Sequence, residues 1–144
     1  MGNNSGSLDK YPVAAVRHLI DARILKDKDR RDNAMCHYAF AAECALKVMY
    51  ANAFPKSGQG FGHKVGEQWD DIAQYYAAFQ TFDVKLEALL GKIAVPDKLF
   101  DRHPTRRYEN DGTYSKEDLQ DADSFAGIVV AEIIEEFIDG RFDL

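Results

Sequence analysis

The sequence has little of the features that mark disulfide-rich, membrane or secreted proteins. It holds two cysteines in 144 residues, and no run approaches the roughly 18 consecutive apolar residues of a membrane span. The first ten residues, MGNNSGSLDK, lack a basic segment followed by an apolar one, so we expect no signal peptide. A chain of this length, 46% hydrophobic and 29% charged, is typical of one globular domain that buries its own core without disulfides or metal.

The two cysteines, Cys36 and Cys44, are eight residues apart on one predicted helix. A helix rises about 1.5 Å per residue, so roughly 12 Å separates them, too far for a disulfide. Neither has the CxxC spacing or neighbouring histidine pair of a zinc site. We therefore expect reduced core cysteines, no metal, no cofactor and a cytoplasmic location.

The net charge of −6 is unevenly distributed. Residues 114–144 carry nine acids against two bases, which gives this segment −7 and leaves about +1 for the rest of the chain. Overall acidity argues against a broad surface that coats nucleic acid, but it leaves room for a local basic site.

The chain is organised around residues 33–54, which predict a long apolar helix rich in alanine. Apolar side chains such as Met35 and Met49 recur at steps of three and four residues. Its few polar residues are His37, Glu43 and Lys47. A helix with so little polar surface is predicted to be central, covered by other helices or by a second subunit.

Residues 11–26 predict a helix before it, with Pro12 in its first turn. The apolar residues of this helix form a predicted stripe: Val13, Val16, Leu19, Ile20 and Ile24. A short charged connector, residues 26–32, then predicts an antiparallel hairpin between the two helices.

Further helices are predicted at residues 63–82 and 83–93, followed by an irregular segment over 95–112. Ser115 opens the last helix with a capping-box pattern to Asp118, and Gly140 is placed to end it. With no strand-like alternation, the sequence predicts an all-α, up-and-down bundle of four to five helices. Residues 1–9 are expected to be a flexible tail, and residues 10–144 a single domain.

The central sequence AECALK, residues 42–47, follows Asn33-Ala34 and His37-Tyr38, and Arg106-Arg107-Tyr108 stands before the last helix. With a third helix led by His63, this order resembles HEPN-type domains over about residues 11–138. The resemblance implies a HEPN-like bundle, frequently dimeric through apolar helices. Many relatives are metal-independent ribonucleases of toxin–antitoxin, defence or RNA-processing systems, whereas others bind nucleotides or partners without catalysis. The partners it implies are RNA or a nucleotide, an antitoxin, or a nucleotidyltransferase.

The family's catalytic signature is an arginine followed four to six residues later by a histidine. Arg31, six residues before His37, has that spacing, and Arg30 lies seven residues before it; both stand at the start of the second helix rather than near the last. The alternative interpretation is that His37 is a structural residue, with its hydrogen bonds satisfied at a helix start or an interface.

Residues 102–108 form the main candidate site, because arginine forks match phosphate oxygens bidentately. In a ribonuclease, His103 would move a proton while Arg102 or Arg106 held the phosphorane charge. Arg107 would add a phosphate contact, and Tyr108 would stack on a base. The alternative is that these arginines pair with the acidic last helix.

Three further polar residues are candidates for lining the RNA or nucleotide site: Glu43, Lys47 and His63. Glu43 and Lys47 have the favourable i, i+4 order, which by itself is worth only a few tenths of a kcal/mol. They either form a structural pair, within the chain or across a dimer, or contribute to the cleft. For His63, the alternative is a helix cap or loop residue.

Overall fold

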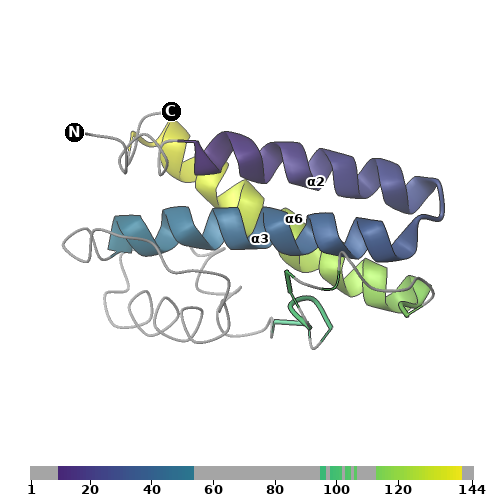
Figure 1. Ribbon diagram of the computed structural model, residues 1–144. Coiled ribbons are helices and arrows are strands. Elements are labelled where there is room, and N and C mark those ends of the chain that lie inside the picture. Colours follow the sequence, from purple (N-terminus) through teal and green to yellow (C-terminus); the bar gives the residue numbers. More distant parts are fainter. Residues whose placement is uncertain are drawn as a thin grey trace.

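The computed structural model describes residues 10–53, 95–96, 98–101, 103–104, 106 and 113–140. These residues contain three helices, α2 (Tyr11–Asp27), α3 (Arg31–Ala53) and α6 (Lys116–Ile138), and no strand (Figure 1). The predicted all-α class is therefore confirmed for the described part of the chain. The tail 1–9 and the predicted helices within 63–93 lie outside it, and with them the helix count of four to five.

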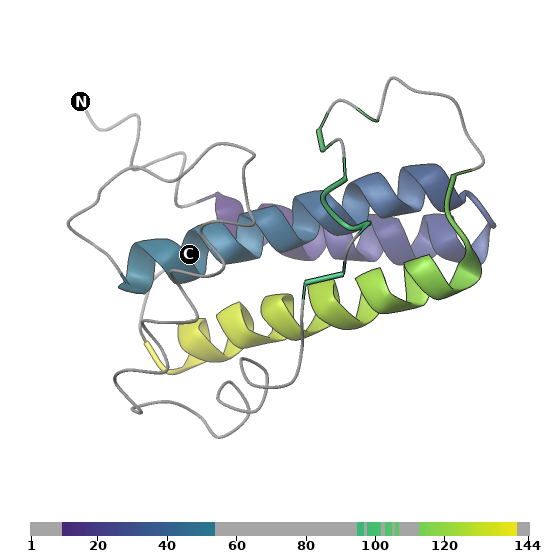
Figure 2. The same ribbon diagram turned by 90° about the horizontal axis from the view of Figure 1, so that it is seen from below.

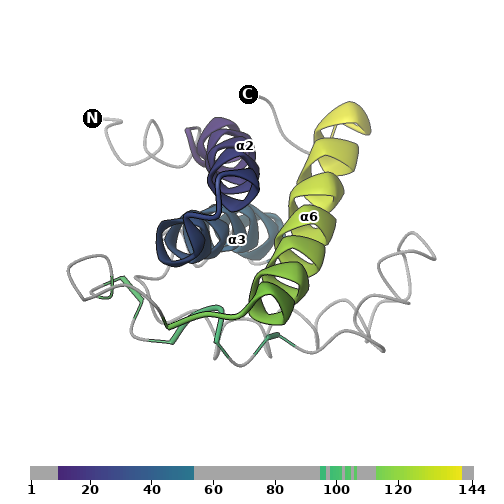
Figure 3. The ribbon, with the colours of Figure 1, turned by 90° about the vertical axis from the view of Figure 1, so that its right-hand side faces the viewer.

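The helices α2 and α3 form the predicted antiparallel hairpin, and α6 packs against both. Seen from below, α6 runs beside α3 in the same direction, so that it is antiparallel to α2 (Figure 2). The end-on view shows the three helices around a common interior (Figure 3). Of the described helices, none is long and apolar enough to cross a membrane.

The helix α3 is the centre of the fold, as predicted. It begins two residues earlier and ends one residue earlier than expected. Side chains 34–36, 38–39 and 41–49 are buried, including both cysteines. This burial occurs within a single chain, so α3 needs no second subunit to cover these residues.

The helix α2 packs through a different face from the predicted stripe. Pro12, Ala15, Leu19 and Ala22 are buried, whereas Val13, Ile20 and Ile24 are each more than half exposed. The expected stripe was thus wrong as a core face, apart from Leu19 and the partly buried Val16, which packs against the core. The physical reason is that alanines on α2 meet the alanine-rich α3, and small side chains allow two helices to approach closely.

The helix α6 begins as the sequence predicts. The Ser115 hydroxyl accepts from the Asp118 N–H at 3.1 Å, and the Asp118 carboxylate accepts from the Ser115 N–H at 2.9 Å. At the other end Gly140 takes a φ of 78°, a left-handed conformation that glycine adopts without steric cost. One face of α6 is buried as far as Ile133, and Phe137 is partly exposed.

A polar cluster joins all three helices. The Tyr38 hydroxyl of α3 donates to Asp123 of α6 at 2.5 Å, and Arg23 of α2 pairs with the same carboxylate at 3.0 Å. Burial on its own raises the pKa of Asp123, but the hydrogen bonds from Arg23 and Tyr38 outweigh it and hold the pKa below its usual value. The ionised carboxylate therefore stabilises the packing of the helices.

Candidate functional site

The carboxylate of Glu43 lies at the centre of a buried charged cluster. Its Oε1 is 2.6 Å from Nε2 of His103, and its Oε2 is 2.8 Å from Nζ of Lys47. The side chains of Glu43, Lys47 and His103 are only 4%, 8% and 1% exposed. The structure thus brings together three candidate residues from α3 and from the segment before α6.

Lys47 contacts both Glu43 and the ring of Tyr11. Burial lowers the pKa of Lys47, but the hydrogen bond to Glu43 and the attraction of its negative charge together outweigh burial, and the pKa lies above its ordinary value. Its ammonium group also lies 4.9 Å from the centre of the Tyr11 ring, a cation–π contact to the start of α2. Lys47 therefore remains charged in the interior because Glu43 is ionised beside it.

Arg106 organises the segment that carries His103. Its Nη1 donates to the carbonyls of Lys98 at 2.8 Å and Asp101 at 3.2 Å, and its Nη2 donates to the carbonyl of Leu99. The residue is buried, at 5% exposure. The guanidinium therefore folds the preceding backbone around itself instead of facing solvent.

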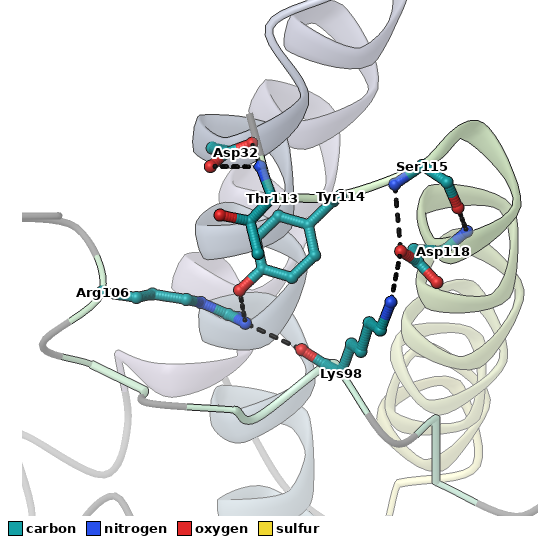
Figure 4. Close-up of polar contacts among 7 residues, drawn as sticks. All are labelled: Asp32, Lys98, Arg106, Thr113, Tyr114, Ser115 and Asp118. Atoms are coloured by element: carbon teal, nitrogen blue, oxygen red, sulfur yellow. Dashed lines mark hydrogen bonds and ion pairs between the residues drawn. The ribbon is translucent and has the colours of Figure 1, made fainter. Parts of the chain in front are cut away.

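The same guanidinium links this segment to the helices. Its Nη2 donates to the Met35 carbonyl of α3 at 3.2 Å, and its Nη1 donates to the Tyr114 hydroxyl at 3.1 Å. Figure 4 shows Arg106 reaching both Tyr114 and the Lys98 carbonyl. Arg106 thus donates to five acceptors, and this long-range role was not predicted from the sequence.

Two outer contacts hold the ends of the same region (Figure 4). Lys98 Nζ lies 3.1 Å from the Asp118 carboxylate, and the Thr113 N–H lies 3.3 Å from both carboxylate oxygens of Asp32. These contacts attach the residues before α6 to the starts of α3 and α6.

The alternative site residues lie in two different places. Arg31 pairs with Asp29 at 2.8 Å in the hairpin connector, and Arg30 is exposed there. His37 instead faces α2, where its Nδ1 is 3.0 Å from Nδ1 of His18. Arg30 and Arg31 therefore lie at the turn of the hairpin, whereas His37 lies at the interface between α2 and α3.

The His18–His37 contact has a definite protonation requirement. With Nδ1 facing Nδ1, one ring nitrogen must donate and the other accept. Burial lowers the pKa of His18, and the neighbouring His37 and Arg17 lower it further. The neutral form of His18 is thereby favoured in the fold.

Phe40 lies between the main and the alternative candidates. Its ring stacks on His18 with centroids 5.4 Å apart and meets His103 edge-on at 4.6 Å. Sequence reasoning missed Phe40, His18 and Tyr114. Only Phe40 could have been found from the sequence, because it is about one helical turn from Glu43. The approach of His18 and Tyr114 to the site depends on the tertiary fold.

The remaining candidates, Arg102, Arg107, Tyr108 and His63, lie outside the described residues. Within the described ranges there is no group of three or more His, Cys, Asp or Glu side chains placed to hold a metal ion. Comparison of the chain with protein-family models, with curated proteins and with solved structures found no match.

The chemistry of the cluster is that of a positioned imidazole beside a carboxylate. Such a carboxylate fixes the histidine tautomer and stabilises its protonated form, an arrangement that general acid–base catalysis also uses. Here, however, the same carboxylate is shared with Lys47, and all three side chains are in the interior. A buried ionised group is stable only when it is paired, so mutual pairing gives each member a structural role.

Proposed function

We propose that the chain is a HEPN-like helical module that acts by binding a partner protein and does not itself catalyse a reaction. The observation that carries this proposal is that the hydrogen bonds of Arg106 are made within its own chain. Its guanidinium donates to four backbone carbonyls and one hydroxyl of its own chain. An arginine that receives an RNA phosphate must direct its N–H groups to the ligand, and these are already directed inward.

The Glu43 cluster supports the same proposal. Its carboxylate binds His103 and Lys47 at once, so these two candidate groups compensate a buried charge. For a phosphate to enter, it would have to break this pairing and leave Glu43 buried beside another anion, which is unfavourable. The cluster is therefore best explained as the attachment of the residue 95–106 region to α3.

The test is incubation of the purified protein with labelled RNA in the presence of a chelator. The wild type is compared with His103→Ala, and circular dichroism checks that both are folded. We expect no cleavage by either protein. Cleavage by the wild type would contradict the proposal, and its loss in folded His103→Ala would identify the Glu43–His103 pair as catalytic.

A second candidate function is binding of RNA or a nucleotide phosphate, with metal-independent RNA cleavage in a toxin–antitoxin, defence or RNA-processing system. The 2.6 Å contact between His103 and Glu43 favours it, because it orients the imidazole as an acid–base group requires. The phosphate contacts would then come from Arg102 and Arg107, with Arg106 positioning the segment.

RNA binding measured by fluorescence anisotropy tests this second function. The variant Arg102→Ala/Arg107→Ala is compared with Lys28→Ala/Lys116→Ala, which also removes two positive charges, from exposed positions. The second function predicts that the arginine variant loses binding at least tenfold while the lysine variant retains it. Equal affinity of all three proteins for RNA would exclude this site.

A further inference from the structure

The outer faces of α2 and α6 form an apolar groove of about 510 Å³. Val13, Val16 and Ile20 line it from α2, and Ile133, Ile134 and Phe137 line it from α6. Val13 and Ile20 are 57% and 53% exposed. This is the side of α2 that the sequence predicted to pack and that the fold leaves outside.

Exposed apolar side chains are also present outside the residues that line the groove. Ile24 on α2 and Ile138 at the end of α6 are also exposed, so large apolar side chains extend along both helices. Scattered exposed apolar residues are ordinary, but a contiguous set along two packed helices is typical of a protein-binding surface.

Two opposite charges stand within this apolar surface. Arg17 and Asp21 both line the groove, and they are four residues apart on α2, which places them one turn apart on the same side. In a two-fold symmetric interface the same patch faces itself, and when the axis is perpendicular to α2 the partner's α2 runs the opposite way. Arg17 of one copy then faces Asp21 of the other, and the reciprocal pair forms at the same time.

We propose that the groove binds a second copy of this chain, and that the α2 helices of the two copies pair antiparallel across a two-fold axis. The apolar side chains of α2 and α6 supply the buried area, and the two Arg17–Asp21 pairs fix the orientation. This proposal rests on the proposed function and names the partner for it. It moves the dimer surface from the apolar central helix, whose side chains are buried by their own chain, to the outer face of α2 and α6.

Sedimentation equilibrium of the full chain tests the pairing, with wild type expected at twice the monomer mass of 16.2 kDa. Ile20→Glu is expected to weaken the dimer at least a hundredfold while circular dichroism remains unchanged. A wild type that stays monomeric at the highest soluble concentration would overturn the proposal. So would a dimer unaffected by Ile20→Glu, because that dimer uses another surface.

Charge reversal tests the two-fold arrangement itself. Arg17→Asp and Asp21→Arg each put like charges opposite one another, so each alone is expected to weaken the dimer at least tenfold. An equimolar mixture of the two variants is expected to restore it, because each introduced charge then meets its opposite. Lys28→Asp, which reverses an exposed charge at the far end of α2, is the matched control and leaves the dimer unchanged.

Failure to restore the dimer in the mixture would overturn the proposed orientation. A monomeric wild type destabilised by Ile20→Glu would assign the groove to a segment of the same chain and would also overturn the proposal. These outcomes are separable from the RNA test. RNA cleavage by a protein that dimerises as expected contradicts only the non-catalytic function, whereas a monomer that does not cleave RNA contradicts only the dimer.

Discussion

Glu43 and His103 are sixty residues apart in the sequence, yet Oε1 of one lies 2.6 Å from Nε2 of the other in the protein interior. The contact fastens the segment before α6 to the middle of the central helix. Arg106 holds the same segment from within, by donating to the carbonyls of Lys98, Leu99 and Asp101. These polar side chains thus connect described parts of the chain that are distant in sequence.

Replacing Arg106 by methionine should lower the free energy of unfolding by about 3 kcal/mol or more. The change removes the guanidinium donor from two buried carbonyls, those of Met35 and Leu99, and from two partly buried ones, and each buried loss costs about 1–3 kcal/mol. Urea denaturation measures the effect. Arg106→Lys, which keeps the charge but not the planar fork, should be intermediate. A loss below about 1 kcal/mol for Arg106→Met would contradict the positioning role, given the usual cost of one lost hydrogen bond.

Tyr38→Phe should destabilise the protein by about 1–2 kcal/mol at neutral pH, since it removes a partly buried hydrogen bond to an ionised acceptor. The folded pKa of Asp123 is below its unfolded value, so this carboxylate contributes stability above the unfolded pKa. That contribution is lost as pH falls through the folded pKa. Tyr38→Phe should therefore differ less from the wild type at pH 2 than at pH 7. An equal difference at both pH values would contradict the assignment.

Gly127→Ala should change stability by less than about 0.5 kcal/mol, because two effects of similar size oppose each other. Alanine is favoured over glycine inside a helix by about 0.5–1 kcal/mol. The new Cβ would, however, lie 2.9 Å from Nη2 of Arg23, and moving that side chain weakens its exposed pair with Asp123, worth about 0.2–1 kcal/mol. In an Arg23→Ala background the same change should stabilise the protein by the whole advantage of alanine over glycine in a helix, about 0.5–1 kcal/mol. Thermal unfolding is measured for the wild type, for each single variant and for the double variant. A double variant less stable than Arg23→Ala alone would contradict this prediction.

Stability should fall as pH drops below about 6.5, the ordinary histidine pKa, in part because of His18. Burial, with His37 and Arg17, places the folded pKa of His18 below that value. The unfolded chain then binds more protons than the folded one, so unfolding becomes easier as pH falls through this range. Urea denaturation between pH 7 and 5 should show a shallower fall for His18→Phe than for the wild type. Identical pH profiles would exclude a contribution from His18.

Much of the described helical fold was predictable because it depends on local signals. The start of α6 follows from the Ser115–Asp118 capping pattern, its end from Gly140, and the position of α3 from its alanine-rich periodicity. The face of α2 was not predictable from apolar spacing. Small residues such as Ala15 allow the closest packing on α3, and the larger apolar residues are consequently left outside.

The candidate site was predictable in composition but not in arrangement. Its residue types mark a charged cluster, and Glu43 and Lys47 follow from helical spacing. Whether an arginine faces solvent or backbone depends on the path of the whole segment. Arg106 reaches the Met35 carbonyl across 71 residues of sequence, and no local pattern encodes that contact.

A double-mutant cycle on Glu43 and His103 tests the structural role of the cluster most directly. Glu43→Gln, His103→Gln and the double variant are compared with the wild type by urea denaturation. Because the two side chains are buried and in contact, we predict a coupling energy of about 1 kcal/mol or more. Additive effects, within about 0.3 kcal/mol, would mean that the contact does not hold the fold together and would contradict the account.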